Sequence, residues 1–214
     1  MHRMRKTASD ACKAAPHKPK IALNGPPALI AFFVTSLLLT FICMAPAQSV
    51  VTLKKQARSG STYEQFILGT MYNQGISVQQ DYARAVFWYR KAAEQGYADA
   101  QGNLCEMYGD GHGVPQDYAQ ALAWCRKAAE QGLAPAQYSL GASYYQGHGV
   151  PQDYAEAYFW FDVAEAGKFK SSNVKQEDVY KYRDEAATHL SPDELTSAQE
   201  RARQWFESHP SKSK

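Results

Sequence analysis

Three copies of one phrase, separated by a constant interval, set the architecture that this sequence can adopt. GHGVPQDYAQALAWCRKAAEQG begins at Gly111, and GHGVPQDYAEAYFWFDVAEAG begins 36 positions later at Gly147. An earlier copy, GISVQQDYARAVFWYRKAAEQG, begins 36 positions before the first, at Gly75. Self-similarity with a period of about 20 to 50 residues indicates repeated units that stack on one another.

Each unit has the pattern of two helices joined by a turn. In the second unit, apolar and small residues recur at helical spacing between Tyr118 and Ala129, which predicts an amphipathic helix. The stretch from Ala134 to Tyr145 predicts another helix, and the glycines and proline that follow it predict a turn. A single helical hairpin cannot cover its own apolar face, so the units must stack and their ends must be capped.

The sequence therefore predicts an all-α fold, an α-solenoid of stacked antiparallel helix hairpins with capping helices at both ends. Its expected parts are an N-terminal capping helix at 48–61, repeats at 62–97, 98–133 and 134–169, and C-terminal capping helices and tail at 170–214. The last helix opens with Ser191-Pro192-Asp193-Glu194, the spacing of a capping box. The apolar side of that helix comprises Leu195, Ala198, Ala202, Trp205 and Phe206.

The fragment AQYSLGASYYQGHGVPQDYAEAYFWF and its two earlier copies resemble the Sel-one-like repeat family, which is related to the tetratricopeptide repeat. The resemblance covers roughly residues 53–167, and Ser77, Gln79 and Cys105 depart from the pattern. It implies an α-solenoid that acts as a protein-protein interaction scaffold or adaptor in a bacterial cell envelope. It also leaves an alternative open, because cysteine-rich relatives are described as hydrolases of β-lactam or peptidoglycan-like substrates.

Residues 1–47 have the pattern of an export signal. A basic leader precedes an uncharged apolar run at 28–44, and Ala45-Pro46-Ala47 provides the small residues of a cleavage site. The expected location is periplasmic or secreted. Because the apolar run is close to the length of a membrane span, the segment could instead stay as an inner-membrane anchor with the repeats in the periplasm.

The net charge belongs mainly to that leader. Without residues 1–47, six of the 23 basic and one of the 21 acidic residues are lost, which leaves 17 and 20 and a net charge of −3. A nucleic-acid-binding domain would carry a basic face. We therefore expect no nucleic-acid partner, and membrane contact only through the N-terminal signal or anchor.

Two cysteines follow the signal, Cys105 and Cys125, and they fall on the two helices of the second unit. An oxidising compartment permits a disulfide between them, but the required Cα separation cannot be read from sequence. The alternative is that both are small buried hydrophobic side chains.

The sequence offers little chemistry for an enzyme. His112 and His148 lie one repeat apart without further ligands, so they are expected to be exposed turn residues rather than a metal pair. Ser172-Asn173-Val174-Lys175 fits the S-x-x-K pattern, but the S-D-N and K-T-G elements that accompany it in penicillin-recognising enzymes do not occur. We predict no enzymatic activity, no metal and no cofactor.

Two sets of repeated side chains are expected to be structural. Asp81, Asp117 and Asp153 lie where the second helices begin, which suits capping or first-turn acids. Recurrence at stacking positions is typical of a repeat core. The aromatic residues expected there are Trp88, Trp124 and Trp160, with Tyr82, Tyr118 and Tyr154.

The first helices should line the concave side of the stack, by analogy with tetratricopeptide arrays. Residues off the core stripe would face an open groove, where aromatic side chains flank an acidic middle and suit an unidentified protein or peptide. The alternatives are an ordinary solvated face and self-association, so the oligomeric state stays open. The predicted groove residues are Tyr63, Phe66, Thr70, Asn73, Asp99, Glu106, Asp110, Tyr138, Tyr145 and Gln146.

Overall fold

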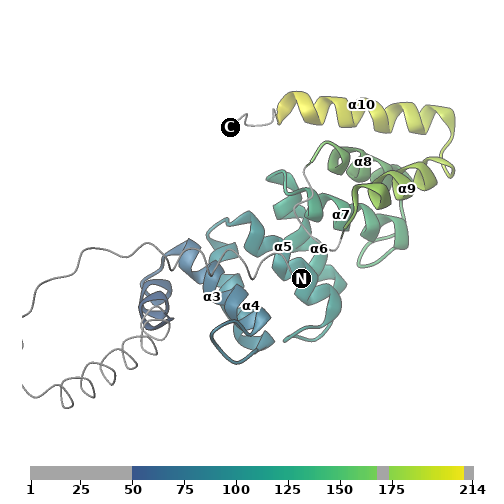
Figure 1. Cartoon of the computed structure of the whole chain (residues 1–214). Helices are drawn as coiled ribbons and strands as arrows, with labels where there is room; N and C mark the ends of the chain where they lie inside the picture. The colour runs from purple at the N-terminus through teal and green to yellow at the C-terminus, as the bar shows by residue number, and fades with distance from the viewer. Residues whose placement is uncertain (1–49, 168–173, 210–214) are drawn as a thin grey trace, which may run out of the picture. The chain divides into compact units, whose positions relative to one another are not determined.

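The computed structural model describes residues 50–167 and 174–209, and in these ranges it contains helices and no strand (Figure 1). The all-α prediction is confirmed. A helical segment at 50–58 precedes the named helices. These are α3 (Thr62–Gln74), α4 (Tyr82–Glu94), α5 (Ala98–Asp110), α6 (Tyr118–Glu130), α7 (Ala134–Gln146), α8 (Tyr154–Glu165), α9 (Gln176–Ala187) and α10 (Pro192–Ser208).

The helices pack as a stack of hairpins, which confirms the predicted solenoid. Helices α3 and α4, α5 and α6, and α7 and α8 pair within their units, while α4 packs on α5 and α6 on α7 between units. None of the helices within the described ranges is long and apolar enough to cross a membrane. The predicted signal at 1–47 lies outside the described residues.

An aspartate caps the start of each second helix, as predicted. The Asp117 carboxylate accepts a hydrogen bond from the backbone N–H of Gln120 at 3.0 Å. Asp81 and Asp153 cap α4 and α8 in the same way. Each side chain thus satisfies a backbone donor that has no partner inside its helix.

The turn between the two helices of a unit requires positive φ angles. Gly111 and Gly113 have φ of 72° and 73°. A Cβ atom on Gly113 would lie 2.3 Å from the carbonyl carbon of Tyr82, so this glycine also permits close contact with the preceding unit. Ser77, at the equivalent position of the first unit, adopts a φ of 60° and thereby keeps the shape of the turn.

Two of the three repeated tyrosines, Tyr82 and Tyr118, lie at the surface, contrary to the prediction that they belong to the core, and Tyr154 is half-buried. Tyr82 and Tyr118 are 37% and 38% exposed, and each stacks on a turn histidine of the next unit. The Tyr118 and His148 ring centroids are 4.5 Å apart. Proximity to the next turn, rather than burial, therefore explains why tyrosine recurs there.

The tryptophan prediction is only partly right. Trp160 is buried, whereas Trp88 and Trp124 are half-buried at the edge of the core. The fully buried position is the next residue in each unit, which is Tyr89, Cys125 or Phe161.

Buried glutamines connect neighbouring units. The Gln101 side chain is 4% exposed, and its Nε2 donates to the backbone carbonyl of Ala93 at 3.0 Å. Its Oε1 accepts from Nε2 of Gln131 at 2.7 Å. Gln65 and Gln137 are buried at the equivalent positions and also bond the carbonyl of a preceding helix. The apolar pattern of the repeats did not predict these polar contacts.

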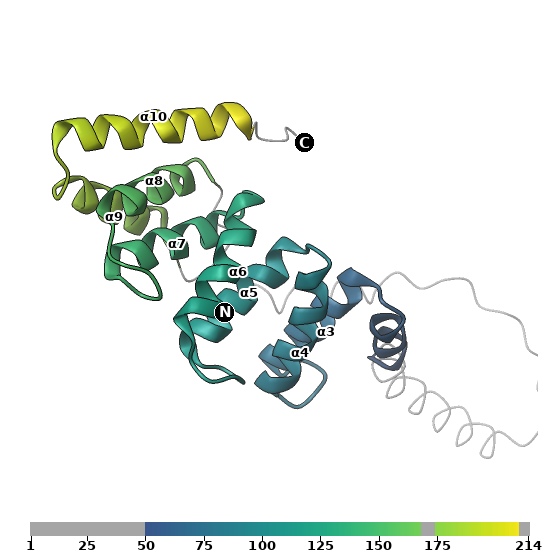
Figure 2. The same cartoon turned by 180° about the vertical axis from the view of Figure 1, so that it is seen from behind.

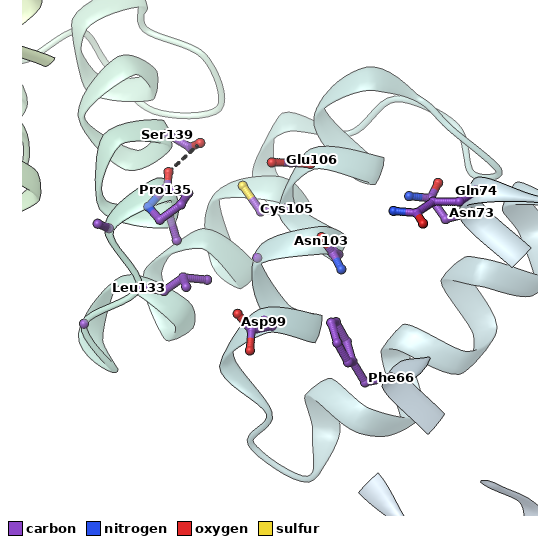
Figure 3. Close-up of a pocket in the computed structure, with 14 residues that line it drawn as sticks. Phe66, Asn73, Gln74, Asp99, Asn103, Cys105, Glu106, Leu133, Pro135 and Ser139 are labelled. Carbon is purple, nitrogen blue, oxygen red and sulfur yellow. Dashed lines mark hydrogen bonds between the residues drawn. The ribbon is translucent and has the colours of Figure 1, made fainter. Parts of the chain in front are cut away.

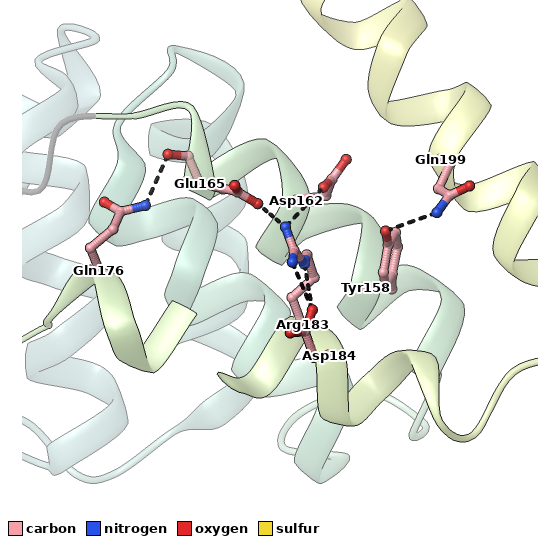
Figure 4. A network of polar contacts seen from close by, with 7 residues as sticks. All are labelled: Tyr158, Asp162, Glu165, Gln176, Arg183, Asp184 and Gln199. Atoms are coloured by element: carbon pink, nitrogen blue, oxygen red, sulfur yellow. Dashed lines mark hydrogen bonds and ion pairs between the residues drawn. The ribbon is translucent and has the colours of Figure 1, made fainter. Parts of the chain in front are cut away.

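The last two helices cover α8. Arg183 of α9 forms ion pairs with Asp162 and Glu165 of α8 (Figure 4). Ala198 and Ala202 of α10 are buried and Trp205 is half-buried, as predicted for the apolar side of this helix. Phe206 was also expected on that side, but it is 38% exposed.

Candidate functional site

Two adjoining hollows run across the first helices of the units, which are α3, α5 and α7. Their volumes are about 710 Å³ and 370 Å³, and Cys105, Glu106 and Ser139 line both of them. Phe66, Asn73 and Gln74 form the α3 side of the larger hollow, as Figure 3 shows. We call the two hollows together the groove.

Seven of the ten predicted groove residues line it. Glu106 lies where the two hollows meet. The other six are Phe66, Asn73 and Asp99 in the larger hollow, and Asp110, Tyr138 and Gln146 in the smaller one.

Tyr63, Thr70 and Tyr145 line neither hollow. Tyr63 is 58% exposed, outside the groove. Thr70 packs within its own unit, where its hydroxyl donates to the carbonyl of Phe66 at 3.1 Å and lies 3.3 Å from the Tyr89 hydroxyl.

Helix α9 covers the aromatic end of the predicted groove. Tyr182 of α9 packs edge-on against both Tyr138 and Tyr145, with ring centroids 6.2 and 6.0 Å away. This burial, with Tyr182 and the Asp178 carboxylate close by, raises the pKa of Tyr138 to about 12. The expectation of open aromatic anchors at this end is therefore wrong for Tyr145, because a capping helix takes the place where a further unit would begin.

The centre of the groove is an acidic stripe on α5. Asp99, Glu106 and Asp110 are spaced by seven and four residues, so they share one face of the helix. Burial raises the pKa of the Glu106 carboxyl, and the nearby Asp110 charge raises it further. Since no Lys or Arg of the described residues lines either hollow, this stripe sets the sign of the local charge.

The opposite wall of the larger hollow comes from the connection between α6 and α7 and the start of α7, which was not among the predicted groove residues. Leu133 and Pro135 line it, together with Asn103 from α5. A Cβ on Gly102 would lie 2.7 Å from Cδ2 of Leu133, so the glycine lets this connection approach α5. The connection recurs every 36 residues, and that recurrence is the signal that could have identified it.

A disulfide joins Cys105 and Cys125 beside the groove, with their Cα atoms 5.1 Å apart. The sequence left open whether the two cysteines form a disulfide or are separate buried side chains, and the structure contains the disulfide. The same two positions hold Gly69 and Tyr89 in the first unit, where the tyrosine ring fills the space that a Cβ on the glycine would need.

The comparisons with known proteins agree with this architecture. The family model described as Sel1 repeat matches residues 65–97, 98–133 and 134–165. The crystal structure of a Sel1 repeat protein from Oxalobacter formigenes is 33% identical, with a TM-score of 0.55, over 64% of this chain and 98% of that chain. The chain belongs to the Sel1 repeat family. Sel1 repeat proteins typically act as scaffolds for protein interaction.

A second similar structure belongs to a protein that is longer than this chain. It is a protective antigen present in uropathogenic Escherichia coli strains, which displays an SLR fold. The two are 30% identical with a TM-score of 0.55, and the match covers 72% of this chain but only 40% of the antigen. The comparison with curated proteins found no match.

The two turn histidines lie apart from one another in the Sel1 stack. His112 and His148 stack on tyrosines of two different units. Within the described ranges, no three His, Cys, Asp or Glu side chains are grouped so that they could hold a metal ion. Lys175 lies at the N-cap of α9, whereas Ser172 falls outside the described residues.

Proposed function

We propose that this Sel1 protein is a non-catalytic interaction module of the bacterial cell envelope, which binds a segment of another protein in the groove. The observation that carries this proposal is the composition of the groove. Asp99 and Glu106 of α5 line the larger hollow together with the apolar side chains of Phe66 and Leu133, and Glu106 and Asp110 line the smaller one. Among the residues that the structure describes, no Lys or Arg lines either hollow. Complementary charge favours a segment that carries Lys or Arg, with apolar side chains beside them.

The hydroxyl groups of the groove also suit a binding site better than a catalytic site. The Ser139 hydroxyl donates to the carbonyl of Pro135 at 3.0 Å, and the Ser143 hydroxyl donates to that of Ser139 at 2.9 Å. A serine nucleophile would instead need a general base within hydrogen-bond reach. Turnover of a chromogenic β-lactam by the purified protein would contradict a purely binding role.

The proposed envelope location rests on the export pattern of residues 1–47 and is consistent with the disulfide, which persists in oxidising compartments. Mass spectrometry of the protein recovered from cell fractions tests it. A periplasmic or secreted chain that begins at Gln48 is expected. An intact N-terminus in the inner membrane would indicate the anchored form, and a cytoplasmic protein with free thiols would contradict export.

The groove itself is tested by photo-crosslinking. A photoreactive amino acid at Asn103, which lies between Asp99 and Glu106, should crosslink a partner protein in intact cells. The Glu106→Lys variant should lose this product, whereas Glu130→Lys, on the exposed end of α6, should retain it. Identical products from both variants, or none from the unaltered protein, would show that the groove is not the binding surface.

A further inference from the structure

The second helices of the first and third units display the same pair of aromatic residues. Phe87 and Trp88 of α4 pack edge-to-face with ring centroids 5.0 Å apart. Phe159 and Trp160 of α8, two periods later, do the same at 4.9 Å. The chain thus contains two copies of one aromatic surface, and their surroundings can be compared.

In the third unit, α10 covers this surface. The Trp205 ring lies 5.3 Å from Trp160 and 6.1 Å from Phe159, both edge-on. One turn earlier, Arg201 lies over the Phe159 ring at 4.6 Å and forms an ion pair with Glu156 at 2.6 Å. Phe159 is only 6% exposed as a result. The structure therefore shows what covers a Phe–Trp pair on this fold: a helix that presents an aromatic ring and, four residues before it, a charge.

In the first unit, no helix of the described residues covers the same surface in the way that α10 does. Phe87 is 52% exposed, and α4 packs against α3 and α5, far from α10 in both Figure 1 and Figure 2. The charge beside the Phe–Trp pair of the first unit is also opposite in sign to that on α8 of the third unit. Arg84 occupies the position equivalent to Glu156, and Lys91 lies one turn beyond Phe87 with its Nζ 5.1 Å from the ring centroid. We call Arg84, Phe87, Trp88 and Lys91 the α4 face.

We propose that the α4 face binds an amphipathic helix of a partner protein, which presents an aromatic residue as Trp205 does and an acidic residue in place of Arg201. The reversed charge argues against α10 of a second copy as the occupant, since its Arg201 would meet Arg84 instead of Glu156. None of the four residues of this face lines the groove, so the proposal is independent of the function proposed for it.

The test uses two peptides with the sequence of Pro192–Ser208, one native and one with Arg201→Glu. Fluorescence anisotropy should show that the charge-reversed peptide binds the protein about tenfold more tightly than the native peptide. Phe87→Ala should abolish this binding, while Ile76→Ala, which truncates an equally exposed side chain of the same unit, should leave it unchanged. Arg84→Glu should switch the preference to the native peptide, because it restores the charge of Glu156.

Several outcomes would overturn the proposal. These are no binding of the charge-reversed peptide, equal binding of both peptides, or binding that survives Phe87→Ala. Tighter binding of the native peptide to the unaltered protein would assign the face to α10 of a second copy. Capture of the protein by anionic lipid vesicles that is lost in Phe87→Ala would assign the face to a membrane surface instead.

Discussion

At the scale of single residues, one pair of positions shows how the repeats tolerate variation. Where the two helices of a unit cross, Gly141 faces Phe161 in the third unit, and a Cβ on that glycine would lie 2.8 Å from the ring. The second unit has Cys105 and Cys125 at these positions, and there a covalent bond replaces the contact between a glycine and a ring. Glycine with an aromatic ring and a cystine are thus two solutions to one packing problem.

This equivalence predicts the effect of substituting both cysteines. The Cys105→Gly, Cys125→Tyr double variant places the glycine and tyrosine of the first unit at this crossing. Because the variant has no disulfide there, its free energy of unfolding should be insensitive to reductant. In the unaltered protein, the disulfide closes a loop with a sequence separation of 20, and its reduction should cost about 3 kcal/mol. Denaturant titrations with and without reductant measure both values.

The matched control is Cys105→Ala, Cys125→Ala, which leaves neither a bridge nor a ring at the crossing. It should be less stable than the Gly, Tyr variant, because it leaves space unfilled. Equal stability of the two double variants would show that the crossing does not require this packing.

At the scale of helices, α9 and α10 retain features of a further repeat. His189 stacks on Tyr154 with ring centroids 4.1 Å apart, as the turn histidines of the earlier units stack on theirs. Pro192 follows His189 by three residues, the same spacing as from His148 to Pro151. The cap thus begins as a fourth hairpin, and α10 then lies on α8, where Trp205 covers the rings of Phe159 and Trp160.

Two adjacent residues of α10 test this role. Trp205→Ala removes a ring that packs on Trp160 and Phe159, and should lower the free energy of unfolding by about 2 to 3 kcal/mol, below the range for a fully buried tryptophan. Phe206→Ala should cost less than about 1 kcal/mol, because its side chain is 38% exposed. Equal losses in denaturant titrations would contradict the assigned face of α10.

At the scale of the whole stack, the buried residues fall into groups that meet at the second unit. Leu104 and Met107 of α5 belong to a cluster that runs back through the first unit to Ala57. Leu122 and Ala128 of α6 belong to a cluster that continues toward α10. The disulfide joins α5 to α6, and so links covalently two helices that contribute to different clusters.

Reduction should accordingly loosen the coupling between the two parts of the stack. In repeat proteins, stability is the sum of the units and the interfaces between neighbours. Native-state hydrogen exchange should show α3 to α5 opening separately from α6 to α10 in the reduced protein, and together with them in the oxidised protein. Uniform exchange in both states would indicate that packing alone couples the parts.

The groove also predicts a pH dependence for partner binding. The raised pKa of Glu106 means that this carboxyl takes up its proton at a higher pH than an ordinary glutamate. Affinity for a cationic segment should therefore fall as the pH decreases through that raised pKa. For folding the sign is opposite, since the ionised carboxylate is the disfavoured form in the folded state, and Glu106→Gln should stabilise the protein above this pH.

Binding measurements and denaturant titrations between neutral and acidic pH, for the unaltered protein and Glu106→Gln, test the sign for binding and the sign for folding respectively. The variant should bind a cationic segment more weakly at neutral pH and lose the upper part of the pH dependence. An unchanged profile would place the titrating group elsewhere.

Part of the groove could be predicted from the sequence. Helical spacing puts Asp99, Glu106 and Asp110 on one face of a first helix, because helical periodicity is a local property, and the analogy with tetratricopeptide arrays turned that face toward the groove. The roles of Tyr138 and Tyr145 could not be predicted in this way. Both contact Tyr182, which lies in α9 beyond the last matching repeat, and no periodicity connects them.

The sequence by itself determined the hairpin, the repeat interval, the capping aspartates and the turn glycines, since each depends on residues close together in the chain. Only the tertiary structure decided that Cys105 meets Cys125, that α10 covers one Phe–Trp pair and leaves the other open, and that α9 closes one end of the groove. The physical reason is that these contacts join different helices, so they depend on how each helix is packed, which local patterns of polarity do not specify.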